Sequence, residues 1–144
     1  SGKVKIAAVP EPFVTMMLSK GKIVMDLQDE WNKATGTKYG IPITGIFVTG
    51  KLQDYAGTVK LFQKSFMDSL SWSYKNIDKA IDITNKQLGI PANVLKASLD
   101  RSYYMYVPAG DCKEEVLNYF KKLNAVYPEG MPKIPDDNFF FAVK

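Results

Sequence analysis

Apolar and polar residues follow two different rhythms along this chain, and the change between them comes near Gly50. Before that point, short apolar and β-branched runs predict strands. These runs cover Val4–Val9, Lys22–Leu27 and Ile43–Thr49. Pro12 fits the first turn of a helix to about Ser19, which Gly21 ends, and residues 28–33 predict a short helical turn.

From Asp54 onward, apolar residues recur at spacings of three and four, which predicts a long helix capped by Asp54. We expect its apolar face to be buried. That face carries Tyr55, Val59, Phe62, Phe66, Leu70 and Tyr74. Further helices are predicted over residues 77–88, ended by Gly89, and around Val94 to Leu99. A brief strand follows at Tyr103–Val107.

A last helix is predicted to begin at the capping box formed by Asp111 and Glu114, and the proline-rich tail after Tyr127 is expected to be irregular. The complete pattern predicts the α/β fold class, with a mostly helical carboxyl-terminal half.

Composition excludes several kinds of function. The chain has 144 residues, of which 46% are hydrophobic, and this is enough for one domain with a packed core. Its formal charge is +4, but Arg101 is the only arginine and the lysines are scattered along the chain. Because nucleic-acid recognition favours arginine and clustered charge, we expect a solvated surface and no nucleic-acid partner.

Catalytic and metal chemistry is disfavoured by the residue types present. The chain has no histidine and a single cysteine, Cys112. A soft-metal site, a Ser-His pair or a Cys-His pair therefore cannot be assembled from it. Asp26, Asp29 and Glu30 lie close together in sequence, but at positions where acids usually meet water. We expect no enzyme activity, no metal and no cofactor.

A candidate ligand site lies where the first predicted strand ends in a Pro-Glu-Pro turn that opens a helix. In open α/β sheets, ligands bind at the carboxyl ends of strands, close to helix amino termini. Thr44 lies where a second predicted strand could face the same cleft. The candidate ligand-binding residues are Pro10, Glu11, Pro12, Phe13 and Thr44.

Most of these residues also have a structural interpretation. Glu11 could simply complement a helix amino terminus, and Thr44 could be an ordinary strand residue. Trp31 and Trp72 fit half-buried packing, although an indole beside a cleft is also a common stacking element. The sequence leaves these alternatives open.

Several segments resemble one family in both sequence and order. They are Gly2–Thr15, with the motif V-P-E-P, Gly40–Thr49, Tyr103–Val107, Lys113–Phe120 and Pro132–Phe140. Together they resemble the solute-binding proteins of ABC importers, in the nitrate, sulfonate, taurine and thiamine-precursor group. This family has the type II periplasmic-binding-protein fold, which consists of two α/β lobes.

The resemblance implies that the chain corresponds to about the last half of such a protein. Residues 1–50 would belong to lobe 2 and include the strand that crosses the hinge, and residues 51–144 would form the helical part of lobe 1. The implied function is capture of a small solute between two lobes and its delivery to a membrane permease. The implied location is extracytoplasmic, in the periplasm or anchored to the cell surface as a lipoprotein, with the export signal upstream.

Two other functions remain open at this stage. One is an enzyme similar to the pyrimidine-precursor synthase, which shares this architecture but relies on histidine and a cysteine-rich motif. The other is a self-contained interaction domain. If the chain is instead the last half of a solute-binding protein, its apolar strands would have unpaired edges, so for that case we also expect a dimer or a strand-swapped assembly with a second copy.

Overall fold

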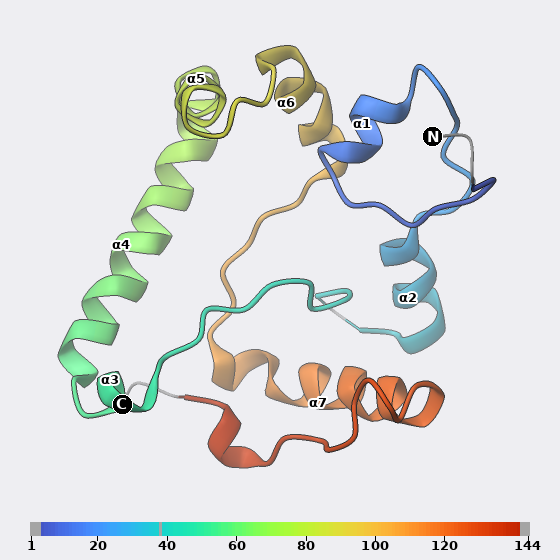
Figure 1. Cartoon of the computed structure of the whole chain (residues 1–144). Coiled ribbons are helices and arrows are strands. Elements are labelled where there is room, and N and C mark those ends of the chain that lie inside the picture. Colours follow the sequence, from blue (N-terminus) through green and yellow to red (C-terminus); the bar gives the residue numbers. More distant parts are fainter. Residues whose placement is uncertain (1–3, 38, 142–144) are drawn as a thin grey trace. The chain divides into compact units, whose positions relative to one another are not determined.

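The regular structure of the chain is helical throughout the residues that the structure describes. This computed structural model describes residues 4–37 and 39–141 (Figure 1). Its elements are α1 (Phe13–Met17), α2 (Leu27–Thr35), α3 (Gly50–Gln53), α4 (Ala56–Lys75), α5 (Ile77–Leu88), α6 (Ala92–Ser98), η1 (Leu99–Arg101), α7 (Ala109–Val126) and η2 (Asp137–Phe139). Because those residues contain no strand, the prediction of an α/β fold, as part of a two-lobed periplasmic-binding-protein-like structure, is wrong.

The four predicted strands are all segments without regular structure. Val4–Val9, Lys22–Leu27, Ile43–Thr49 and Tyr103–Val107 form no strand pairs among the described residues, and only Leu27, the first residue of α2, enters a helix. A β-branched, apolar run shows that a segment suits a pleated surface, but the ladder itself needs a neighbouring strand. The sequence pattern identified segments that suit a strand, but it does not show whether a second strand lies beside them.

Several helix ends follow the local signals in the sequence. The Asp26 side chain caps α2 by accepting hydrogen bonds from the backbone nitrogens of Gln28, at 2.9 Å, and Asp29, at 3.2 Å. Gly36 and Gly89 end α2 and α5 with φ of 66° and 69°, a left-handed conformation that glycine adopts without strain. The boundaries predicted for α5 are therefore confirmed.

Other predicted ends are wrong. The first helix stops at Met17, before Ser19. Asp54 ends α3 and does not cap α4, which follows Tyr55. The last helix begins at Ala109 after Pro108, so Asp111 lies within its first turn and is not the cap. Proline is well suited to a helix start because it has no N–H to leave unpaired, and here it prevails over the acidic pair.

The chain divides into two compact units. The first unit comprises residues 4–24 and 68–105 and contains α1, α5, α6 and η1, with α6 packed against both α1 and α5. The second comprises residues 25–67, without residue 38, and 106–141, and contains α2, α3, α7 and η2. Helix α4 begins in the second unit and ends in the first. The division into two lobes inferred from the family stays a prediction.

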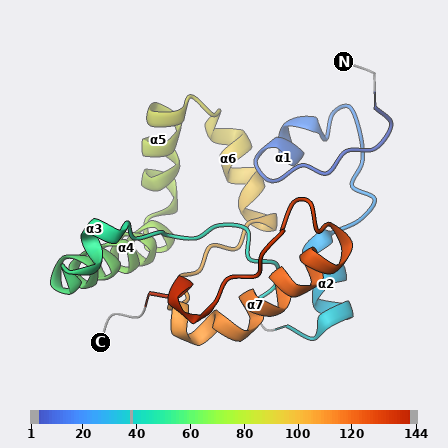
Figure 2. The ribbon, with the colours of Figure 1, turned by 60° about the horizontal axis from the view of Figure 1, so that its bottom comes forward.

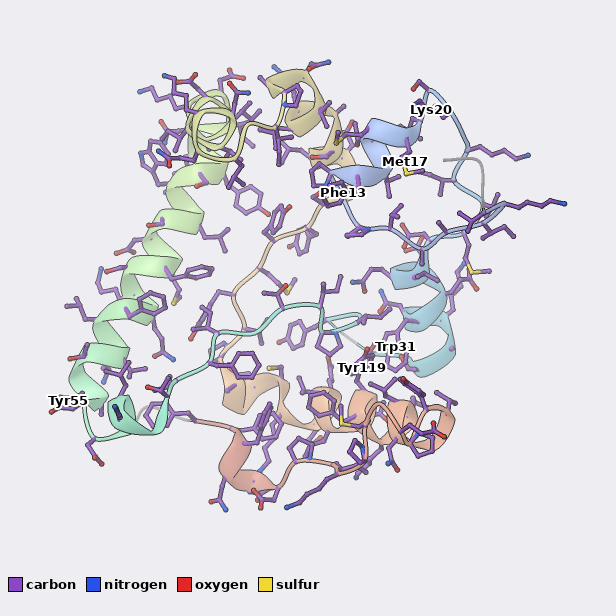
Figure 3. The ribbon with its side chains drawn as sticks, viewed as in Figure 1. Phe13, Met17, Lys20, Trp31, Tyr55 and Tyr119 are labelled. Atoms are coloured by element: carbon purple, nitrogen blue, oxygen red, sulfur yellow. The ribbon has the colours of Figure 1, made fainter. Side chains whose placement is uncertain are left out.

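The second unit is organised around aromatic rings. Trp31 of α2 and Tyr119 of α7 point toward one another (Figure 3), with ring centroids 5.4 Å apart in an edge-to-face arrangement. The series continues from Phe120 to Phe139, with ring centroids 5.9 Å apart, and from Phe139 to Phe47, with ring centroids 6.0 Å apart. Consecutive ring contacts thus connect α2, α7, η2 and the segment before α3.

The irregular tail after α7 folds back along that helix (Figure 2). The Asn124 side chain donates a 2.7 Å hydrogen bond to the carbonyl of Met131 at the turn. Further along, Lys113 Nζ lies 2.8 Å from Asp137 Oδ1 and over the ring of Phe140. These contacts hold η2 beside the start of α7.

Burial is the largest departure from the expected structure. Val59, 6% exposed, is the only hydrophobic residue that is buried among those described. All four aromatic residues of the helix face that was predicted to be buried are exposed: Tyr55 (61%), which precedes α4, and Phe62 (52%), Phe66 (40%) and Tyr74 (44%) within it. The prediction that this face is buried is therefore wrong. Helical spacing shows which face needs a cover, but the covering layer must come from another element.

Candidate functional site

The predicted ligand turn lies in the first unit and leads into α1. The backbone carbonyl of Pro10 accepts a hydrogen bond from the Val14 N–H at 3.2 Å, and the carbonyl of Pro12 accepts one from Met16 at 3.1 Å. The Glu11–Pro12 peptide bond is cis. The turn is thus joined to the first helical turn by its own backbone.

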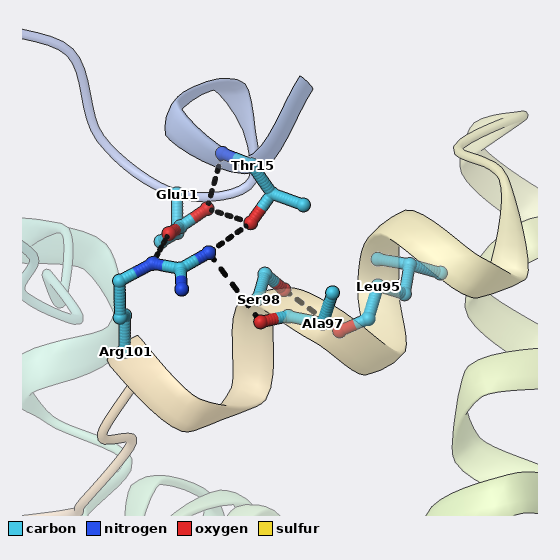
Figure 4. A network of polar contacts seen from close by, with 6 residues as sticks. All are labelled: Glu11, Thr15, Leu95, Ala97, Ser98 and Arg101. Atoms are coloured by element: carbon cyan, nitrogen blue, oxygen red, sulfur yellow. Dashed lines mark hydrogen bonds and ion pairs between the residues drawn. The ribbon is translucent and has the colours of Figure 1, made fainter. Parts of the chain in front are cut away.

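Glu11 is the centre of a polar network in this unit (Figure 4). Its carboxylate accepts a 2.6 Å hydrogen bond from Arg101 Nε and two from Thr15, at 2.8 Å from Oγ1 and 3.1 Å from the backbone nitrogen. Arg101 Nη2 in turn donates to Thr15 Oγ1 at 2.6 Å and to the carbonyl of Ala97 at 3.4 Å. A planar guanidinium donates along two directions at once, so one arginine joins the turn, α1 and the end of α6.

The electrostatics of this network favour an ionised Glu11. Its side chain is only 10% exposed, and that of Arg101 is 30% exposed. Burial alone raises the pKa of Glu11, but the hydrogen bonds from Arg101 and Thr15 and the positive charge of Arg101 outweigh it, and the pKa lies below its ordinary value. The carboxylate is therefore already occupied by partners within the chain.

The remaining predicted site residues are placed differently. Pro10 is exposed, Pro12 is half-buried, and the Phe13 side chain is 55% exposed. Thr44 is exposed and belongs to the other unit, in the segment before α3. Pro10, Glu11, Pro12 and Phe13 lie together because they are consecutive in the chain, and Thr44 belongs to the other unit.

Sequence reasoning missed Arg101 and Thr15. Arg101 is 90 residues from Glu11 in sequence, and no local pattern joins them. One signal was present, because Arg101 is the only arginine and follows an acidic residue at the end of a short helix. Its partner could not have been chosen among the acids without the structure.

No other chemistry-bearing cluster stands out in residues 4–37 and 39–141. They contain no group of three or more His, Cys, Asp or Glu side chains that could hold a metal ion. Burial raises the pKa of the Cys112 thiol, and the nearby carboxylates of Glu115 and Asp111 act in the same direction. This thiol is therefore a weak nucleophile. None of the described helices has the length and apolar character needed to cross a membrane.

Two open depressions lie in the first unit, away from the predicted turn. One is lined by residues 74–79, where α4 meets α5. The other is lined by Asp68, Ser69, Trp72, Ser73 and Ile83. Trp72, 42% exposed, therefore borders a shallow surface, whereas Trp31 is half-buried against Tyr119. For Trp31, the packing interpretation is the one that the geometry favours.

Comparisons of the chain with protein-family models, with curated proteins and with solved structures gave no match. The resemblance to solute-binding proteins therefore rests on the sequence segments described above.

Proposed function

We propose that this chain is a non-catalytic binding component that captures a small solute for an ABC importer, with the Pro10–Phe13 turn as part of its contact surface. The proposal includes an extracytoplasmic location and delivery of the solute to a membrane permease. It starts from the resemblance of the V-P-E-P segment and its successors to solute-binding proteins.

The observation that carries the proposal is the fixed geometry of the turn. Three hydrogen bonds to the Glu11 carboxylate hold it, while Pro10 and Phe13 are exposed. A surface that is ordered before the ligand arrives loses little conformational entropy on binding. An exposed aromatic ring beside such a turn offers both apolar area and a face for stacking.

This arrangement assigns different roles to the predicted residues. Phe13 and Pro10 would touch the solute, and Glu11 would act as a positioning residue through Arg101 and Thr15. Thr44 belongs to the second unit, and its role as a ligand-binding residue stays a prediction.

The experiment is a binding screen on the protein by native mass spectrometry and thermal shift. The panel contains sulfonates including taurine, nitrate, amino-pyrimidines and amino acids. The best ligand is then titrated against Phe13→Ala and the matched control Phe62→Ala, since Phe62 is an aromatic residue of similar exposure, 52%, on α4. We expect Phe13→Ala to weaken binding at least fivefold, with the control unchanged.

A positioning role for Glu11 predicts a different signature. Glu11→Gln should weaken binding and also lower the unfolding temperature, because it loosens the turn. Phe13→Ala should weaken binding at unchanged unfolding temperature. No binding to any member of the panel, or equal losses in Phe13→Ala and Phe62→Ala, would reject the solute-binding proposal.

A second candidate function, a protein interaction domain, is favoured by one specific observation. Large hydrophobic side chains are exposed across both units, including Ile6 (81%), Phe47 (75%) and Tyr103 (81%). Where exposed apolar side chains gather into a patch, another polypeptide usually binds there. This candidate predicts association without any small solute, which sedimentation velocity at several protein concentrations would detect.

A further inference from the structure

The segment Ile43–Thr49 of the second unit combines three properties that favour pairing with another strand. It has no charged residue, since the sequence from Ile41 to Gly50 is I-P-I-T-G-I-F-V-T-G. Its three largest apolar side chains are exposed, Ile43 by 73%, Ile46 by 47% and Phe47 by 75%, and Val48 is half-buried. In the described part of the chain, the backbone groups of residues 43–48 have no hydrogen-bond partner.

These properties indicate which kind of polypeptide segment would bind to residues 43–49. Unpaired N–H and C=O groups along a chain rich in β-branched residues are satisfied best by an adjacent strand. An uncharged segment with high β propensity also pairs readily with copies of itself. The occupant is therefore an extended, apolar strand.

We propose that Ile43–Thr49 pairs in antiparallel fashion with the same segment of a second copy of the chain, with the two Ile46 residues opposite one another. In this register Phe47 lies opposite Gly45 of the second copy, and Thr44 lies opposite Val48. A glycine opposite a phenylalanine leaves room for the ring to cover the neighbouring backbone. Thr49 and Ile43 form the outer pair.

The register also removes a charge conflict. Lys51 is the first charged residue after the segment, and this register places it opposite Ile41 of the second copy. Two positively charged chains can therefore pair here without facing lysines. The arrangement has twofold symmetry and closes on itself, so it gives a dimer and not a fibre.

The available area is consistent with a reversible dimer. Taking about 200 Å² for a fully exposed large side chain, Ile43, Ile46, Phe47 and the adjoining Phe139, which is 44% exposed, offer about 500 Å² in each copy. Two copies would bury about 1,000 Å², the lower limit for a specific interface. We therefore expect the dimer to depend on protein concentration. This inference is independent of solute binding.

Cross-linking tests the register directly. In a Cys112→Ser background, Ile46→Cys places two thiols opposite one another, at a Cα separation of about 4.5–5.5 Å that a disulfide can span. The control Thr44→Cys places its thiols about 13 Å apart along the paired strands. Under mild oxidant we expect a disulfide dimer for Ile46→Cys, at least tenfold more abundant than for Thr44→Cys. Equal cross-linking of both, or of neither, overturns the proposed register.

Charge insertion tests the interface itself. Ile46→Lys places two ammonium groups opposite one another and should convert the dimer into a monomer in sedimentation velocity. The matched control Ile6→Lys changes an exposed isoleucine, 81% exposed, in the other unit and should leave the dimer intact. A wild-type chain that stays monomeric up to high concentration, or a dimer lost through Ile6→Lys and kept in Ile46→Lys, overturns the proposal.

Discussion

Different kinds of interaction stabilise the interior of each of the two units. In the first unit, Arg101, Glu11 and Thr15 form a charge-assisted network with distances of 2.6–3.1 Å. In the second, the series from Trp31 through Tyr119 and Phe120 to Phe139 joins elements by ring contacts at 5.4–5.9 Å. One unit relies on a few directional bonds, and the other on apolar area.

The difference has physical consequences. Directional bonds fix geometry with few atoms, so the first unit can hold a turn in place while most of its side chains are exposed. Ring contacts stabilise in proportion to the area that they cover, and they are insensitive to pH. The first unit should therefore respond to protonation and charge removal, and the second to ring removal.

Each unit contains one of the two tryptophans, Trp72 in the first and Trp31 in the second. A Trp72→Phe background reports on the second unit alone, and a Trp31→Phe background reports on the first. The predictions below use these two probes, in order of decreasing effect.

We expect the largest effect from Phe120→Ala in the second unit. Removing a half-buried ring that contacts both Tyr119 and Phe139 should lower the free energy of unfolding by about 2–3 kcal/mol. The measurement is urea unfolding followed by Trp31 fluorescence. The control Phe62→Ala removes an exposed ring and should cost less than about 1 kcal/mol. Equal losses in the two variants would contradict the role of the ring series.

Glu11→Gln should destabilise the first unit by about 1–2 kcal/mol, because it weakens charge-assisted bonds from Arg101 and leaves that guanidinium without its counter-charge. Urea unfolding followed by Trp72 fluorescence measures the loss. The control is Asp82→Asn in the same unit, which breaks the exposed pair with Lys86 and should change stability by less than about 0.5 kcal/mol. If Arg101→Lys and Glu11→Gln gave fully additive losses in the double variant, the two side chains would not be coupled.

The same network predicts a dependence on pH. Because the Glu11 pKa is lowered on folding, its stabilisation is complete above the unfolded-state pKa, about 4.3, and is lost as the pH falls through the lower folded-state pKa. The stability difference between wild type and Glu11→Gln should therefore be constant near neutral pH and shrink below about pH 4. A difference that grew on acidification would reverse the sign of the proposed shift.

The smallest effect is expected at Tyr74. Its hydroxyl donates to the Tyr104 carbonyl at 2.8 Å and accepts from the Tyr104 N–H at 3.0 Å, so it satisfies the backbone of one residue in an otherwise unpaired segment. Tyr74→Phe should cost about 0.5–1 kcal/mol at this exposed position. Tyr103→Phe in the same unit is the control, since no hydrogen bond joins that hydroxyl to the described residues, and it should be neutral. A neutral Tyr74→Phe, in the Trp72 fluorescence assay, would show that water replaces this contact.

Local signals in the sequence predicted much of the helical structure and little of its packing. Gly89 ends α5 through atoms within a few residues, so reading the sequence sufficed to predict that end. Asp26 caps α2 in an equally local way, but the apolar run Lys22–Leu27 had placed it in a predicted strand. The strands failed because each needs a partner from elsewhere in space. At the candidate site, Glu11 was identified from its turn, but Arg101 was not.

The sequence by itself determined the presence of the longer helices α4, α5 and α7, the bounds of α5 and which residues are apolar, because propensity and capping act over one or two turns. Only the tertiary structure decided that Glu11 binds Arg101 and Thr15, since that choice depends on bringing together residues 90 positions apart. It also decided that the face of α4 stays largely exposed and that the backbone of residues 43–48 has no hydrogen-bond partner among the described residues. Burial and pairing are properties of two surfaces, and a pattern along one segment specifies only one of them.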